Sequence, residues 1–151
     1  MIEIERKFLV TSSEYRKSYH RKSMIIQGYL SKDPNRIVRV RIRGDQGFIT
    51  IKGISTKDGL SRYEWEDEIS VIKAQELMLL CLPIIIKKNR CEINFKGSLF
   101  EVDEFIGLHQ GLIIAEVELN SIEDKIELPT WVGEEVTGNK NYYNSYLSSP
   151  V

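Results

Sequence analysis

The feature that most limits how this chain can fold is an alternation of charged and apolar residues that recurs in six segments. Successive side chains of an extended strand point to opposite faces, so charges two positions apart share one face. The paired charges of each segment have one sign, whereas a surface tuned only for solubility mixes the signs. The pattern therefore predicts strands with one charged and one apolar face. The charged positions are Glu3 and Glu5, followed by Lys7; Arg39, Arg41 and Arg43; Glu64 and Glu66; Lys88 and Arg90; Glu101 and Asp103; and Glu116 and Glu118.

Two arrangements accommodate such strands. In an ordinary antiparallel sheet the charged face lies in water and the apolar face covers a core. If the strands instead close into a barrel wrapped by helices, the charged faces line its interior. That interior is tolerable only if it is wide, wet and able to bind something of matching charge.

Turn residues divide the chain into about eight strands and three or four short helices. Hairpin connections dominate, as at Gly44–Gly47, which indicates an antiparallel α+β architecture. No repeat or linker interrupts the chain, so residues 1–151 are expected to form a single domain. The expected strands are 1–10, 24–30, 36–43, 48–52, 62–70, 84–93, 99–105 and 112–120. The expected helices are 14–22, 74–82, a short one between 124 and 129, and a last one from 141.

The composition excludes several classes of protein. The 21 Lys and Arg residues nearly balance the 22 Asp and Glu residues, so no bulk charge favours nucleic acid or an anionic membrane as a partner. The longest apolar run, 77–86, is interrupted by Pro83 and is too short to cross a membrane. Cys81 and Cys91 fit no metal or redox spacing, and only two histidines are present. A reduced, soluble, cytoplasmic protein is expected.

The charged residue types themselves indicate a chemistry. Guanidinium groups of arginines two residues apart, together with lysines, suit the oxygens of a phosphate chain. Paired carboxylates without a neighbouring His or Cys prefer a hard cation such as Mg²⁺ or Mn²⁺. A site with both features is typical of metal-assisted phosphoryl transfer or phosphate hydrolysis.

The motifs resemble those of a known family along nearly the whole chain. Residues 3–7, Glu-Ile-Glu-Arg-Lys, match the ExExK signature of the CYTH superfamily, the triphosphate tunnel metalloenzymes. The length and residues 131–135 are most similar to the short bacterial inorganic tripolyphosphatases. The resemblance implies a closed eight-stranded antiparallel β-barrel, a triphosphate tunnel, with short helices packed outside. Its other motifs lie at 27–30, 39–41, 52, 62–66, 88–90, 101–103, 116–118 and 133–137.

The resemblance also implies roles for individual residues. Lys7 would lie near the scissile phosphate, where it positions that group or helps to orient the attacking water; Lys7, Glu5 and Glu118 are the catalytic candidates. The expected ligands of Mg²⁺ or Mn²⁺ are Glu3, Glu5, Glu116 and Glu118, with Glu64, Glu66 and Asp103 as further or water-mediated ligands. The expected phosphate-binding residues are Lys7, Arg39, Arg41, Lys52, Arg62, Lys88, Arg90 and Lys140.

The function implied is metal-dependent hydrolysis of tripolyphosphate, or a related triphosphate, to diphosphate and phosphate by attack of a metal-activated water on a terminal phosphoryl group. A class IV adenylate cyclase, which makes cyclic AMP and pyrophosphate from ATP, is the alternative enzyme. A non-catalytic polyphosphate-binding module is a further alternative, although such a module has no need of paired carboxylates. The partner would be a small-molecule triphosphate, and the protein a monomer or homodimer. No segment predicts a nucleobase pocket, and Tyr142, Tyr143 and Tyr146 are interpreted as helix-packing residues.

Overall fold

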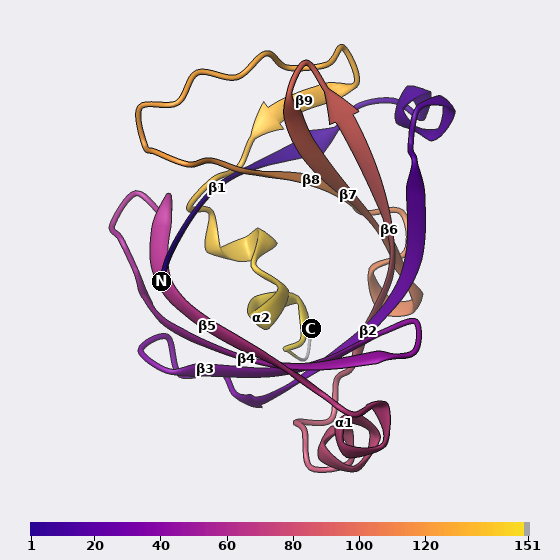
Figure 1. Cartoon of the computed structure of the whole chain (residues 1–151), viewed down its shortest axis with the longest axis vertical. Coiled ribbons are helices and arrows are strands. Elements are labelled where there is room, and N and C mark those ends of the chain that lie inside the picture. Colours follow the sequence, from indigo (N-terminus) through magenta and orange to yellow (C-terminus); the bar gives the residue numbers. More distant parts are fainter. Residues whose placement is uncertain (150–151) are drawn as a thin grey trace.

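The alternating strands close on themselves, so that one face of the sheet surrounds an interior. The computed structural model describes residues 1–149. Eight antiparallel strands follow the order β5-β4-β3-β2-β6-β7-β8-β1, and β1 pairs with β5 to complete the ring (Figure 1). The expected closed eight-stranded barrel is confirmed. The strands of the ring are β1 (Ile2–Val10), β2 (Arg21–Ser31), β3 (Ile37–Arg43), β4 (Gln46–Ser55), β5 (Ser61–Ile69), β6 (Ile86–Phe95), β7 (Ser98–Ile106) and β8 (Ile113–Glu118).

The first strand joins both ends of the ring. Residues 2–4 of β1 pair with β5, and residues 5–9 pair with β8. In antiparallel pairs, directly opposed residues present their side chains to the same face. Glu3 is therefore beside Arg62, and Lys7 is beside Glu116. The ExExK segment lies at the seam where the barrel closes.

A ninth strand, β9 (Val132–Glu135), adds to the far end of β1 and was not predicted. It has four residues, too few to display an alternating pattern. Gly133 allows the close approach, because a Cβ atom there would lie 2.5 Å from Cγ2 of Thr11. β9 helps to cover the outer face of the barrel.

An apolar core lies between the barrel wall and this outer layer. Its inner side comes from outward-facing residues of β1, β6, β7 and β8, and its outer side includes Tyr15 and Trp131. The Trp131 ring meets Phe100 and Tyr15 edge-on at centroid distances of 5.7 and 5.8 Å. Such aromatic pairs add to the free energy of area burial. The buried members are Phe8, Tyr15, Cys91, Ile93, Phe100, Val102, Ala115, Val117 and Trp131.

The helices are shorter than the sequence suggested. The expected helix 14–22 is a single 3₁₀ turn, η1 (Glu14–Lys17), because β2 already begins at Arg21. The short helix expected between residues 124 and 129 does not form; there the Asp124 carboxylate accepts the backbone N–H groups of Asn120 and Ser121 in a loop. The helix α1 (Val71–Met78) is capped by Ser70, whose hydroxyl accepts the N–H of Lys73. A 3₁₀ turn η2 (Gly107–His109) follows β7.

The position of the last helices corrects one detail of the expectation. α1 lies outside the barrel, as expected, but the C-terminal segment with η3 (Lys140–Tyr142) and α2 (Asn144–Leu147) lies inside the ring (Figure 1). Three inward-facing residues of the wall, Ile86, Phe105 and Ile114, form one apolar cluster. Leu147 packs on them and is itself only 6% exposed. Burial of this apolar section explains why the tail lies inside.

Candidate active site

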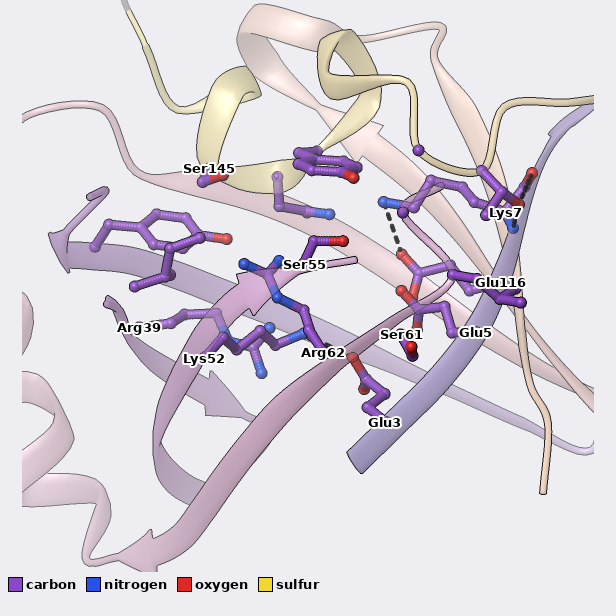
Figure 2. A pocket seen from close by; sticks show the side chains of 18 of the residues that line it. Glu3, Glu5, Lys7, Arg39, Lys52, Ser55, Ser61, Arg62, Glu116 and Ser145 are labelled. Carbon is purple, nitrogen blue, oxygen red and sulfur yellow. Dashed lines mark hydrogen bonds and ion pairs between the residues drawn. The ribbon is translucent and has the colours of Figure 1, made fainter. Parts of the chain in front are cut away.

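The inward faces of the strands form one charged pocket beside the C-terminal segment (Figure 2). Ten ionisable groups predicted from the sequence line it, seven cationic and three acidic. The excess of positive charge suits a polyanion. The cationic residues are Lys7, Arg39, Arg41, Lys52, Arg62, Lys88 and Arg90, and the acidic residues are Glu3, Glu5 and Glu116.

The three carboxylates gather where β1 meets β8 and β5. Glu5 and Glu116 point into the pocket beside Lys7 (Figure 2). The ammonium of Lys7 lies 3.7 Å from a carboxylate oxygen of Glu116, and that of Lys52 lies 3.2 Å from Glu3. Acidic groups from two strands are thus held together in a largely buried corner.

The pKa values reflect how unfavourable this corner is for several negative charges. Burial raises the pKa of Glu3 to about 7, and a hydrogen bond with Glu64 adds to the rise. Burial also raises the pKa of Glu5 well above its ordinary value, helped by the charge of Glu116. Burial alone would raise the pKa of Glu116 as well, but Lys7 and the nearby Arg90 lower it. Glu116 therefore keeps its charge, while Glu3 and Glu5 favour the protonated form until a cation is near.

This donor set fits a hard divalent cation. Within residues 1–149, no three His, Cys, Asp or Glu side chains are arranged so that they could hold a metal ion by themselves. Mg²⁺ does not need such an arrangement, because it keeps several waters and binds proteins through one or two carboxylates together with substrate phosphates. The oxygen-only corner of Glu3, Glu5 and Glu116 matches that mode, and a cation there would stabilise the ionised forms of Glu3 and Glu5, which burial and neighbouring carboxylates disfavour.

Arginines of β3 provide donors on another side of the pocket. Arg39 donates to the Thr50 hydroxyl at 3.1 Å and to Glu66 at 3.4 Å. Its Nε is buried without a hydrogen-bond partner among the described residues. Arg41 makes two hydrogen bonds to the Gln27 carbonyl, at 3.0 and 2.8 Å. An unpaired buried donor is unfavourable, so an anionic ligand beside Arg39 would supply the hydrogen-bond acceptor that its Nε lacks.

A fully buried ion triad holds two further cations. The Asp103 carboxylate accepts two hydrogen bonds from Arg90, at 2.8 and 2.9 Å, and lies 2.7 Å from the Lys88 ammonium. Burial lowers the pKa of Lys88 to about 7, although Asp103 opposes this. The pKa of Asp103 is lowered by Arg90 and Lys88 against the effect of burial. In this arrangement Asp103 compensates the charges of two cations that line the pocket.

The C-terminal segment adds contacts that charge patterns could not reveal. The side-chain oxygen of Asn144, Oδ1, accepts one hydrogen bond from the Lys88 ammonium and one from the Gln27 side-chain amide, both at 3.0 Å. Lys7 donates to the backbone carbonyl of Tyr142 at 3.2 Å. Asn144 is a neutral residue in the tail and carries no periodic signal. The family resemblance includes residues 27–30 but implies no role for Gln27.

We expect Asn144→Ala to lower kcat/KM for a triphosphate about tenfold, because it removes an acceptor shared by Lys88 and Gln27. The effect should be mainly on KM, since the lost contacts orient Lys88, which is expected to bind phosphate. Steady-state kinetics would measure it. The neighbouring exposed residue offers a matched control, Asn141→Ala, which should be silent; equal effects of both variants would contradict the role of Asn144.

Other predicted site residues lie farther from the pocket lining. Glu118 is paired with Glu5 across β1 and β8, but it is exposed. Glu64 lies 4.0 Å from Lys52, and Glu66 accepts from Thr50 at 2.7 Å. Lys140 does not line this pocket; it lines a neighbouring cavity. As ligands or phosphate contacts, these residues stay predictions.

Comparison with known proteins decides the family. Residues 1–149 match the CYTH domain. The chain belongs to the CYTH family. It is 44% identical to an inorganic triphosphatase of Acetivibrio thermocellus, over 96% of this chain and 92% of that protein. It is 37% identical to an inorganic triphosphatase of Nitrosomonas europaea, over 100% and 99% of the two chains.

Solved structures place this CYTH domain among similar barrels. The crystal structure of an inorganic triphosphatase that is 32% identical has a TM-score of 0.70, covering 99% of this chain and 95% of that one. A Hippeastrum protein described as an adenylyl cyclase with a dominant triphosphatase activity is 14% identical, with a TM-score of 0.62 over 79% and 80% of the two chains. The latter likeness concerns the fold alone. Within residues 1–149, no helix of this CYTH domain is long and apolar enough to span a membrane.

The raised pKa values predict how the stability of this CYTH domain depends on pH. Below pH 4.5, Glu3 is neutral in both the folded and the unfolded chain. Between pH 4.5 and about 7, the unfolded chain ionises more readily, so the free energy of unfolding falls as pH rises. Glu5 acts with the same sign. Glu116, whose pKa is lowered, has the opposite effect, but only at more acidic pH.

We therefore expect the Tm in EDTA to fall between pH 5 and pH 7, and the gain in Tm from added Mg²⁺ to grow over the same range. Differential scanning fluorimetry would measure both. Glu3→Gln should flatten the profile in EDTA, because its amide cannot ionise. A profile of unchanged slope in Glu3→Gln would show that Glu3 does not titrate as described.

Proposed function

We propose that this chain is a divalent-metal-dependent triphosphatase that hydrolyses inorganic tripolyphosphate, or a related triphosphate, to diphosphate and phosphate. The observation that carries the proposal is the pocket itself, where seven cationic side chains meet three carboxylates, of which Glu116 is buried and Glu3 and Glu5 are half-buried. Two relatives at 44% and 37% identity, both named inorganic triphosphatase, support the same activity.

The cations would bind and orient the phosphate chain. Arg39, Arg41 and Arg90 present planar forks that match phosphate oxygens, while Lys52 and Lys88 act as point charges. Their positions are set by rigid strands, so little reorganisation is needed as charge develops on the leaving diphosphate. Arg39, Lys88 and Arg90 are also buried, which strengthens these interactions.

Glu3, Glu5 and Glu116 would hold Mg²⁺ or Mn²⁺, with Glu118, Glu64 and Glu66 as further or water-mediated ligands. A bound divalent cation supplies charge neutralisation on phosphate oxygens and a water of lowered pKa. Lys7, whose ammonium lies beside Glu116 and the Tyr142 carbonyl, would position the terminal phosphoryl group for attack by water. The bond from the terminal phosphorus to its bridging oxygen breaks, which releases phosphate and diphosphate.

Each alternative function predicts something different. A cyclase would use the same pocket to join the ribose 3′-oxygen of ATP to its α-phosphorus. A polyphosphate-binding module would need only cations, whereas this pocket also holds carboxylates, which in their ionised form repel an anion unless a metal is present. Removing these carboxylates from water costs free energy, and a module that only binds anions would gain nothing in return. The carboxylates therefore favour a catalytic site over a binding module.

The experiment offers purified protein tripolyphosphate and, separately, ATP, with Mg²⁺, with Mn²⁺ or with EDTA. Phosphate, diphosphate and cyclic AMP are then quantified. We expect equal amounts of phosphate and diphosphate from tripolyphosphate with either metal, and none in EDTA. Cyclic AMP as the main product would establish the cyclase instead, and tight binding without turnover would establish the module.

We also propose a cellular location, a partner and an oligomeric state for the enzyme. Both cysteines are free thiols, which suits a reducing, cytoplasmic location. The partner would be a small-molecule triphosphate, without nucleic acid, and the protein would be a monomer or a homodimer. Size-exclusion chromatography with light scattering distinguishes the two oligomeric states.

A further inference from the structure

Gln27 of β2 is a fully buried polar residue that does not line the charged pocket. Three residues that do line the pocket contact its side chain: Arg41, Tyr29 and Asn144 all lie within hydrogen-bond distance of it. A polar side chain inside a protein is stable when its donors and acceptors are used. The partners of Gln27 therefore show which groups of the pocket it holds in place.

Arg41 differs from the neighbouring arginines of the pocket in the partner it has. Arg39 and Arg90 each lie beside a carboxylate, at 3.4 and 2.8 Å. Arg41 forms no ion pair with any residue in 1–149. Instead its Nε and Nη2 donate to the side-chain oxygen of Gln27 at 3.0 and 2.8 Å. Because one oxygen bridges two nitrogens of the guanidinium group, the plane of that group is fixed.

The neutral partner preserves the charge of Arg41. A carboxylate in the place of the Gln27 amide would also orient the guanidinium, but it would cancel the positive charge that attracts a phosphate. Burial already lowers the pKa of Arg41 to about 9, and the charges of Arg39 and Arg90 add to the fall. A phosphate oxygen at the remaining N–H groups would supply the negative charge that Arg41 lacks.

The other end of the Gln27 amide connects to a second cation. Its nitrogen donates to Oδ1 of Asn144 at 3.0 Å, and the same oxygen accepts from the Lys88 ammonium at 3.0 Å. Arginine and lysine can only donate, so each amide must turn its oxygen toward its cation, and the nitrogen of Gln27 is left to face Asn144. The two amides thus link cations of β3 and β6 across β2, the strand between them.

We propose that Gln27 is a positioning residue for triphosphate hydrolysis, which holds the Arg41 guanidinium toward the phosphate chain and, through Asn144, keeps Lys88 in place beside it. This rests on the proposed function, since the pocket must take a triphosphate. Because Gln27 does not line the pocket, it acts through these cations and not on the substrate itself.

Two variants at position 27 separate positioning from core packing. Gln27→Met keeps an unbranched side chain and removes its hydrogen bonds, so kcat/KM for tripolyphosphate should fall about tenfold, mainly through KM, the scale of a hydrogen bond to a charged group. Gln27→Glu keeps the acceptor for Arg41 but cancels the charge, so KM should rise further than in Gln27→Met. If Gln27 only fills the core, Gln27→Glu, the closer match in shape, is the milder change, and that order overturns the proposal.

A core variant and a double-mutant cycle provide the controls. Ile93→Ala, at a residue 2% exposed in the apolar core outside the wall, should lower the Tm without changing KM. In an Arg41→Ala background, Gln27→Met should have little further effect, because the main group through which it acts is gone. Additive effects of these two changes, or equal rises in KM in Ile93→Ala and Gln27→Met, overturn the positioning role.

Calorimetric titration with tripolyphosphate in EDTA separates this role from the proposed function, because it needs no turnover. Binding that weakens in the order parent, Gln27→Met, Gln27→Glu supports positioning even if the parent protein hydrolyses nothing. Hydrolysis by the parent, with binding and KM unchanged in both variants, overturns positioning and leaves the proposed function intact. Failure of the parent to bind tripolyphosphate, in EDTA and with Mg²⁺, overturns positioning as well.

Discussion

Glu5→Gln should reduce the turnover of tripolyphosphate about a hundredfold or more, the scale of losing one preorganised charge contact at a reacting centre. The same change should raise the Tm of the protein in EDTA. The pKa of Glu5 is raised chiefly by burial, so the folded protein already favours a neutral group there. An amide resembles the protonated acid and removes the unfavourable ionisation. Phosphate release and scanning fluorimetry measure the two effects.

Opposite changes in activity and stability distinguish a metal-binding carboxylate from a structural one. Glu76→Gln, at an exposed position on α1, is the control and should alter neither quantity. Full activity in Glu5→Gln would contradict the assignment of the metal corner. A large fall in Tm would show that the Glu5 carboxylate stabilises the fold rather than binding a cation.

Asp103→Asn should lower the free energy of unfolding by about 3–5 kcal/mol, the usual loss when one partner of a buried ion pair is removed. Asp103 is 1% exposed and compensates both Lys88 and Arg90. Without it, two buried cations face each other. Urea unfolding measures the loss, and saturating tripolyphosphate should restore part of it, because phosphate oxygens can replace the missing carboxylate.

A second carboxylate on the same arginine provides the control. Glu101 lies 3.1 Å from Arg90, but its side chain is 28% exposed, so Glu101→Gln should lower the free energy of unfolding by less than about 1 kcal/mol. If Asp103→Asn instead leaves stability intact and weakens only Mg²⁺ binding, Asp103 is a metal ligand, as the family resemblance implied.

The inward charges were predictable because a strand has a strict two-residue period. Glu3, Glu5 and Lys7 share one face of β1, and the register of β1 with β8 places Lys7 beside Glu116. The sequence could not reveal which pairs neutralise each other. Asp103 looked like any other acidic residue of an alternating strand, and its contact with Lys88 depends on the pairing of β6 with β7.

The parts that sequence reasoning missed depend on tertiary packing. Asn144 reaches Lys88 because Leu147 anchors the tail on apolar wall residues inside the barrel, a contact between segments far apart in the chain. β9 is held by pairing with β1 rather than by its own propensity. The shape of the cavity next to the charged pocket depends in the same way on where the C-terminal segment passes the loop after β4.

In the proposed reaction, water attacks the terminal phosphoryl group of a triphosphate held in the charged pocket. Hydrolysis of tripolyphosphate in water enriched in ¹⁸O, with Mg²⁺, tests it by mass spectrometry of both products. We expect one ¹⁸O atom in the phosphate and none in the diphosphate. Label in the diphosphate would place the attack on the central phosphorus, and failure to hydrolyse tripolyphosphate would contradict the claim altogether.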